Sequence, residues 1–340
     1  VVANLPKGKA PGQSGWTYEM IGAACEDPTA FTALNDLVNV LIPGQLPYIP
    51  DLLDCRLLSF AKPDGGVRPI AVGEVLTRLV SLCALAMEPA LGPSLAPYQF
   101  AVGIPGGSEV VAHAVRTYLE NDPSNVAVSV DFRNAFNACS RTEALTATAE
   151  MAPRLYNWLR YQYQQPTRLW VAGAPEGTPP LMSEEGVRQG DPAATAAFCM
   201  GLQRILLETV RRHPTALLFA IADDVTVCAN GVAGVPVAQT LTQLAKDRLN
   251  LDVVPRKSTA FSYDGTAGAA AAAALGYQHA EDGIVCVGTP IGYDDYQAAY
   301  AARKVDAAQR AIHATLDLPL RKQERWVLLT QSQQLAIQHL

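Results

Sequence analysis

Positive charge is scarce in this 340-residue sequence. It contains 26 lysine and arginine residues against 32 aspartate and glutamate residues, which gives a net charge of −6. Proteins that bind nucleic acid are usually basic, so this balance argues mildly against a nucleic-acid-binding protein. It does not exclude a local basic groove, because net charge says nothing about where the charges lie.

Long hydrophobic runs and paired cysteines are also missing. No apolar run reaches the ~18–20 residues that a membrane-spanning helix needs, so a membrane protein is not expected. The seven cysteines are scattered without a Cys-x-x-Cys pair, and the five histidines are dispersed too. A disulfide framework or zinc site is therefore not expected, and an intracellular, reducing compartment fits better. The first residues include neither a methionine nor the apolar core of a signal peptide, so we expect a fragment of a longer protein.

Hydrophobic residues are abundant. They make up 49% of the sequence and charged residues 17%, a composition that predicts a globular protein with a large buried core. Residues 55–73 predict a hairpin, because two short apolar runs flank Pro-Asp-Gly-Gly. Strands are also expected at residues 125–132 and 252–262, with helical segments grouped between them, while the alanine-rich residues 267–276 fit either a helix or a surface insertion. This order predicts an α+β fold, in which helices back one face of an antiparallel sheet.

Two adjacent aspartates interrupt an otherwise apolar stretch, LLFAIADDVTVCA, at residues 217–229. Successive residues of a strand point to opposite faces, so a regular strand would bury one of the two carboxylates. A strand–turn–strand with Asp223 and Asp224 at its tip avoids this cost. Another apolar strand ends at Asp131, and pairing of the two strands would bring three carboxylates together. Their repulsion would be relieved by Mg²⁺, which prefers oxygen ligands.

Seven segments of the chain resemble, in the same order, the motifs of the reverse transcriptase domain of non-LTR (LINE-like) retrotransposons. Each segment is weak evidence alone, but the ordered set is specific. One position departs from the family pattern, because Ile221 stands where an aromatic residue usually precedes the two aspartates. The segments are KGKAPGQSG (7–15), AKPDGGVRPIAVGEVLTRLV (61–80), VDFRNAFNACSR (130–141), GVRQGDP (186–192), IADDVTV (221–227), PRKSTAF (255–261) and GTPIG (288–292).

The resemblance implies a right-hand polymerase fold with three parts. Residues 1–125 would form the fingers, residues 126–293 the palm with part of the fingers near 150–190, and residues 294–340 the start of a truncated thumb. The implied activity is that of an RNA-directed DNA polymerase, which extends a DNA primer with dNTPs on an RNA template. It would use two Mg²⁺ ions, for which Mn²⁺ would substitute, and would work in the nucleus if the element is eukaryotic.

The same resemblance assigns roles to particular residues. Asp131, Asp223 and Asp224 would bind the metal ions, and Lys257 would donate a proton to the leaving pyrophosphate. The aromatic side chain of Phe136 would lie beneath the incoming sugar and exclude a 2′-hydroxyl group. The full set of expected substrate-binding residues is Lys62, Arg68, Phe132, Phe136, Gln189 and Gly190.

For basic residues outside this set, the sequence predicts surface positions or contacts with phosphates. Arg188 is expected to be a surface charge. Arg56 and Arg78 would contribute, with Lys62 and Arg68, to a basic cluster of the fingers that contacts phosphates.

Two kinds of alternative remain open at this point. A group II intron maturase-like polymerase or an RNA polymerase could share the same palm. A decayed or domesticated copy could bind nucleic acid without any activity. The sequence leaves the oligomeric state, the template and the host undetermined.

Overall fold

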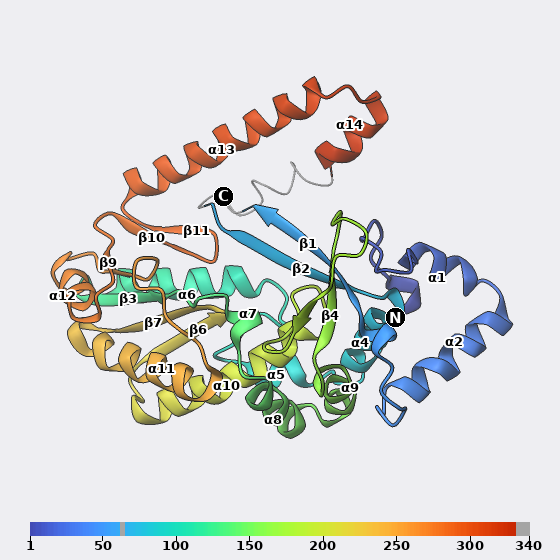
Figure 1. Cartoon of the computed structure of the whole chain (residues 1–340). Coiled ribbons are helices and arrows are strands. Elements are labelled where there is room, and N and C mark those ends of the chain that lie inside the picture. Colours follow the sequence, from blue (N-terminus) through green and yellow to red (C-terminus); the bar gives the residue numbers. More distant parts are fainter. Residues whose placement is uncertain (62–64, 331–340) are drawn as a thin grey trace.

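Two β-sheets and a short β-ribbon organise the chain (Figure 1). The computed structural model describes residues 1–61 and 65–330. The larger sheet has the strand order β6-β7-β3-β8-β9, the smaller has the order β2-β1-β4-β5, and β10 pairs with β11 in the ribbon. The strands are β1 (Cys55–Ala61), β2 (Val67–Gly73), β3 (Asn125–Val130), β4 (Thr167–Val171), β5 (Leu181–Ser183), β6 (Leu217–Ile221), β7 (Asp224–Asn230), β8 (Thr259–Phe261), β9 (Gln278–His279), β10 (Gly283–Cys286) and β11 (Thr289–Gly292).

Helices occupy most of the remaining described chain, so the predicted α+β class is confirmed. The α-helices are α1 (Tyr18–Ala24), α2 (Pro28–Leu41), α3 (Pro50–Leu53), α4 (Val75–Ala86), α5 (Leu91–Leu95), α6 (Gly107–Asn121), α7 (Ala135–Ala138), α8 (Arg141–Met151), α9 (Pro153–Tyr163), α10 (Ala194–Arg212), α11 (Gly234–Leu249), α12 (Thr266–Leu275), α13 (Asp294–Asp317) and α14 (Lys322–Leu328), and two short 3-10 helices are η1 (Val2–Asn4) and η2 (Gly231–Ala233).

The five-stranded sheet is built around β3. This strand pairs antiparallel with β7, so that Val130 lies opposite Val225, and it pairs antiparallel with β8 on its other side. β6 and β7 form an antiparallel hairpin, whereas β8 and β9 are parallel. The strand that ends before Asp131 and the strand that begins with Asp224 are therefore neighbours, as the sequence predicts.

Both faces of β3 are buried, because its side chains alternate between two hydrophobic cores. Val126, Val128 and Val130 belong to the larger core, to which α8, α10 and α11 also contribute. Ala127 belongs to a smaller core that includes side chains of α6, β10 and β11. The expectation of helices on one face only is thus incomplete, because α6 and the β-ribbon cover part of the second face.

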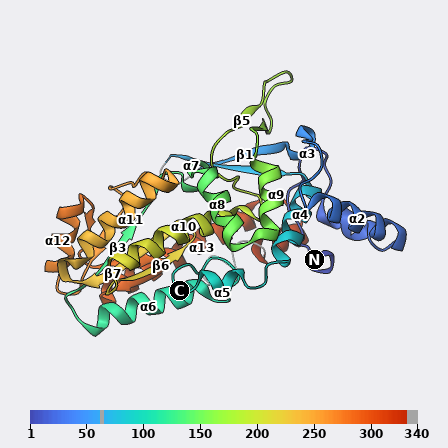
Figure 2. The same cartoon turned by 90° about the horizontal axis from the view of Figure 1, so that it is seen from below.

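The predicted hairpin of residues 55–73 is confirmed. β1 and β2 pair antiparallel from Cys55 opposite Gly73 to Ala61 opposite Val67. Its turn includes residues 62–64, which lie outside the described residues. β1 also pairs in parallel with β4, and α4 packs against α9 nearby. α2 lies at one end of the molecule and α12 at the other, as both views show (Figures 1 and 2), and α1 lies beside α2 in Figure 1.

The segment from residue 252 to residue 276 differs from its expected structure. The single strand expected at 252–262 is wrong, because Pro255 has no N–H to donate to a strand pair. Instead the Lys257 N–H donates to the Val254 carbonyl (2.9 Å) in a turn, and only β8 is a strand. The alanine-rich residues form α12, which packs on β8.

A membrane-spanning helix was not expected from the sequence. Among the helices of residues 1–61 and 65–330, none combines the length and the apolar character that a membrane span requires.

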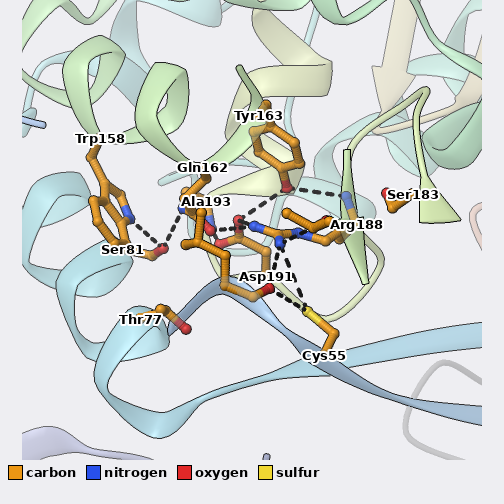
Figure 3. Close-up of polar contacts among 12 residues, drawn as sticks. Cys55, Thr77, Ser81, Trp158, Gln162, Tyr163, Ser183, Arg188, Asp191 and Ala193 are labelled. Atoms are coloured by element: carbon orange, nitrogen blue, oxygen red, sulfur yellow. Dashed lines mark hydrogen bonds and ion pairs between the residues drawn. The ribbon is translucent and has the colours of Figure 1, made fainter. Parts of the chain in front are cut away.

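A buried polar network joins the smaller sheet to α9 and to the loop before α10 (Figure 3). The Arg188 guanidinium donates to Gln162 Oε1 (2.5 Å) and to the Leu53 carbonyl (3.1 Å). The Tyr163 hydroxyl accepts the Arg188 backbone N–H (3.1 Å) and donates to the Asp191 carboxylate (3.0 Å). Arg188 is only 5% exposed, so the expectation of a surface charge is wrong. Its burial is tolerated because acceptors surround the guanidinium and Asp191 lies 4.0 Å away.

We predict that Arg188→Met lowers the free energy of unfolding by roughly 3–5 kcal/mol, because it leaves the buried Asp191 carboxylate without its cation. Chemical denaturation of the two proteins measures this loss. Arg211→Met is the matched control, since Arg211 pairs with Glu208 and its side chain is 72% exposed. That control should lose less than about 1 kcal/mol. A similarly small loss for Arg188→Met would contradict the structural role of the network.

Candidate active site

The ends of β3 and β7 open into a cleft of about 1000 Å³. Its lining brings together residues that are far apart in the sequence and come from β2, the segment after β3, the β6–β7 turn and the turn before β8. The predicted site residues that line it are Asp131, Asp223, Asp224, Lys257, Arg68, Phe132, Phe136 and Gln189. Of the remaining two, Gly190 follows Gln189 directly, and Lys62 lies outside the described residues.

The β6–β7 turn is formed by Ala222 and Asp223. Ile221 pairs with Asp224, so the expectation that both aspartates sit at the tip is wrong by one residue. Asp224 is already the first residue of β7, and Ala222 takes the other turn position with a left-handed φ of +53°. The two neighbouring carboxylates therefore start from different backbone environments, one in the turn and one at the strand end.

The segment that carries Asp131 is fixed against residues 252–258. The Asp131 N–H donates to Ser258 Oγ (3.0 Å), and its carbonyl accepts the Val254 N–H (2.8 Å). Phe132 forms a β-bridge with Val253 and is only 5% exposed, which leaves its ring mainly in the core. These contacts hold the Asp131 backbone at the edge of the cleft, next to the turn that contains Lys257.

The three carboxylates interact electrostatically. The pKa of Asp224 is raised to about 6, first because protein atoms displace part of the water around its carboxyl group, and then because the charges of Asp223 and Asp131 repel a third negative charge. Burial raises the pKa of the Cys199 thiol on α10, and Asp223 adds to that shift. The cleft is thus a place where negative charge is costly and where a cation would be favoured.

The donor chemistry of the cleft suits a hard divalent cation, because all three candidate ligands are carboxylates. Among the described residues, no group of three or more His, Cys, Asp or Glu side chains is arranged to hold a metal ion. Mg²⁺ sites in enzymes that act on phosphates are often completed by water and by substrate phosphates, with one or two carboxylates from the protein. A divalent cation held by carboxylates of this cleft would therefore need further ligands from water or from substrate phosphates.

Four cationic side chains line the same cleft. Arg68 belongs to β2, and Lys257 and Arg256 lie in the turn before β8. Arg133 follows Phe132, and its backbone N–H donates to the Asp252 carbonyl (2.7 Å). Arg133 and Arg256 are missing from the residues selected by sequence, although each is adjacent to a selected one. Their position gives the acidic cleft a basic rim that suits phosphate groups.

Arg78, in contrast, is not available for phosphate. It is 7% exposed, its guanidinium lies over the Tyr18 ring at 4.9 Å, and it donates to the Ala10 carbonyl (2.9 Å). The expectation that it belongs to a basic phosphate-binding cluster is therefore wrong. The aromatic face of Tyr18 and the Ala10 carbonyl stabilise the buried guanidinium, although its Nε has no hydrogen-bond partner.

Phe136 and Gln189 lie on the side of the cleft nearest to α10. The Phe136 ring stacks on the Phe198 ring with centroids 4.7 Å apart. The Gln189 carbonyl accepts the Ala71 N–H of β2 (2.7 Å), which attaches this loop to the hairpin. Gly190 has a φ of +126°, and a Cβ there would lie 2.4 Å from the Ala71 carbonyl oxygen. The glycine is therefore required by the close approach to β2.

The mainly antiparallel five-stranded sheet, its helices and the acidic residues at the neighbouring ends of β3 and β7 agree with the α+β fold expected from the sequence motifs. In sequence, the chain is 27% identical over 247 residues, or 67% of its length, to the "Retrotransposable element SLACS 132 kDa protein" of Trypanosoma brucei gambiense. It spans 20% of the length of that protein. This similarity, with the ordered motifs, supports a reverse transcriptase domain of the non-LTR retrotransposon type.

No protein-family model matches the sequence. Among solved structures, apo telomerase from Candida tropicalis, truncated from its C-terminal domain, superposes with a TM-score of 0.46 and 11% sequence identity. The superposition covers 63% of this chain and 51% of the telomerase chain.

We predict that the Asp224 carboxyl group titrates near pH 6 and not near its usual value of 3.8. A raised pKa means that the neutral form persists to higher pH, so removing a neighbouring negative charge should lower it. Asp223→Asn should therefore shift the midpoint toward 3.8, and Asp131→Asn should do so less. Carbon-13 NMR of the side-chain carboxyl groups measures these midpoints. A midpoint that Asp223→Asn leaves unchanged would argue against the interaction, and Asp306→Asn on the exposed part of α13 serves as a neutral comparison.

Proposed function

We propose that the chain is an RNA-directed DNA polymerase, which extends a primer 3′-hydroxyl with dNTPs on an RNA template. The observation that supports this most directly is the cleft whose described lining contains Asp131, Asp223 and Asp224 together with four cationic side chains. Such a combination suits nucleotidyl transfer, in which the 3′-oxygen attacks the α-phosphate and pyrophosphate leaves. RNA template, DNA primer and dNTPs are the proposed partners.

The proposed cofactor is a pair of Mg²⁺ ions, for which Mn²⁺ would substitute. Asp131 and Asp223 would be the main ligands, and Asp224 would support them from the end of β7. When bound, the ions would lower the pKa of the primer 3′-hydroxyl and neutralise charge on the triphosphate. The pairing of β3 with β7 holds the backbone of these aspartates in place, and so does the hydrogen bond from the Asp131 N–H to Ser258 Oγ.

The cationic rim is proposed to bind and orient the triphosphate. Arg68 and Arg133 provide planar guanidinium groups that match phosphate oxygens, as does Arg256. Lys257 is placed in the same cleft and would donate a proton to the departing pyrophosphate. Gln189 would contact the sugar or base of the incoming nucleotide, while Gly190 permits the loop to approach β2.

The proposed division of the chain keeps residues 1–125 as fingers, 126–293 as palm with part of the fingers near 150–190, and 294–340 as the start of the thumb. In that arrangement the β1–β2 hairpin contributes Arg68 from the fingers side of the cleft. Synthesis primed at a nicked target, as for a retroelement copy, is a further proposal for the longer protein.

We predict that Asp223→Asn reduces primer extension with Mg²⁺ or Mn²⁺ by at least ~10³-fold, because it removes a charge that the transition state requires. Extension of a labelled primer on an RNA template by purified protein measures the effect. Asp247→Asn is the matched control, since Asp247 lies on α11 and accepts a hydrogen bond from Gln243 (2.8 Å) away from the cleft.

The result also separates the alternatives. Near-normal extension by Asp223→Asn would remove this residue from the mechanism. A wild-type chain that binds primer–template but never extends it would favour an inactive nucleic-acid-binding copy. Preference for rNTPs by the wild type would favour an RNA polymerase with the same palm.

We predict that Phe136→Val raises the ratio of rNTP to dNTP incorporation by about tenfold or more, because a smaller side chain leaves room for a 2′-hydroxyl group. Single-nucleotide incorporation assays measure both rates, and the ratio corrects for any loss of stability caused by weaker stacking on Phe198. Phe31→Val, at an exposed position of α2, should leave the ratio unchanged. An unchanged ratio for Phe136→Val would argue against a steric role.

A further inference from the structure

One buried glutamine holds the turn that carries Asp223. Gln99 lies between α5 and α6, and its side chain has no exposure to solvent. Its Oε1 accepts the Ala222 N–H (2.9 Å), and its Nε2 donates to the Ala222 carbonyl (3.1 Å). A single side chain therefore satisfies both backbone polar groups of this turn residue.

The backbone around Gln99 reinforces this contact. Gln99 forms a parallel β-bridge with Ala220, the Phe100 N–H donates to the Ala220 carbonyl (2.8 Å), and the Ala220 N–H donates to the Tyr98 carbonyl (2.7 Å). In the five-stranded sheet, β6 is an edge strand, so these groups would otherwise lack a strand partner. The Ala101 N–H also donates to Gln99 Oε1 (3.3 Å), which fixes the side-chain amide.

The turn needs such support because its conformation is unfavourable. Ala222 has a φ of +53°, in the left-handed region that residues with a Cβ rarely adopt. Strained backbone of this kind persists only when its surroundings hold it. The Ala222 carbonyl also belongs to the planar peptide group that continues into Asp223. The Gln99 Nε2 bond therefore sets the orientation of the backbone from which the Asp223 side chain starts.

We propose that Gln99 is a positioning residue of the active site, which holds Ala222 in its left-handed conformation and so directs Asp223 into the cleft. The sequence gives no sign of this role, because the two residues are 123 positions apart. The effect on metal binding rests on the proposed function, whereas the effect on the turn does not.

The test uses Gln99→Met, which keeps the length of the side chain and removes both hydrogen bonds. Hydrogen–deuterium exchange of the full chain should show amides of residues 221–224 exchanging at least tenfold faster, while the rest of β7 is unchanged. The dissociation constant for Mn²⁺ should rise at least fivefold. In primer extension, kcat should fall while KM for dNTP changes less than twofold, which separates positioning from loss of substrate binding.

Three further variants serve as controls for the Gln99→Met result. Gln203→Met is the matched control, because Gln203 is another buried glutamine (1% exposed) on α10, and it should leave turn exchange and Mn²⁺ binding unchanged. In an Ala222→Gly background, Gln99→Met should have a smaller effect, because glycine adopts a positive φ without strain. If Gln99→Met does not fold, Gln99→Glu keeps an acceptor for the Ala222 N–H. As a carboxylate it replaces the donor with a negative charge against the Ala222 carbonyl, and it should still accelerate exchange at the turn.

The possible results are distinguishable from failure of the proposed function. Unchanged exchange at residues 221–224, or an equal change with Gln203→Met, would overturn the role of Gln99. Absence of Mn²⁺ binding and of primer extension by the wild type would instead contradict the proposed polymerase, and the exchange measurement would still decide whether Gln99 holds the turn.

Discussion

The antiparallel pairing of β3 with β7, in one particular register, is the constraint on which the candidate site depends. Val130 lies opposite Val225, so the next residue of one strand and the preceding residue of the other are both aspartates. Because side chains alternate along a strand, a shift by one residue would exchange the two buried faces of β7 and move Val225 and Val227 out of the larger core. The valines of β3 and β7 in the larger core oppose such a shift, so the hydrophobic core also fixes the positions of the carboxylates.

Bringing like charges together has a cost, which is visible in the raised pKa of Asp224. The carboxylates stay close together despite this repulsion because separate hydrogen bonds hold the backbone of each segment in place. Asp131 is held by Ser258 and Val254, and the turn before Asp224 is held by Gln99. These anchors come from segments that do not contribute carboxylates themselves. Shifted pKa values of this kind cluster at functional sites, and a bound cation would offset the repulsion among the carboxylates.

Local patterns in the sequence were sufficient for the elements that carry the site. The β1–β2 hairpin, the strand before Asp131 and the acidic hairpin each have a local signal, such as Pro-Asp-Gly-Gly or an apolar run interrupted by charge. The predictions that were wrong, the exposure of Arg188 and the position of the acidic turn, concern features that the surrounding sequence alone does not determine. Arg188 is buried because Leu53 and Gln162 accept its hydrogen bonds, and no window around residue 188 contains that information. The turn is displaced because alanine adopts a left-handed conformation there, against its own preference.

Net charge is a poor guide to the charge of a single cleft, because it does not record where the charges lie. Four cationic side chains meet three carboxylates in its described lining, so the local balance is positive although the whole chain is acidic. The cations come from three separate segments, β2, the residues after β3 and the turn before β8, and only folding brings them together. At physiological salt, exposed charges further apart than about 8 Å are largely screened from one another. A phosphate in the cleft would therefore respond to Arg68, Arg133, Arg256 and Lys257 far more than to acidic residues on distant surfaces.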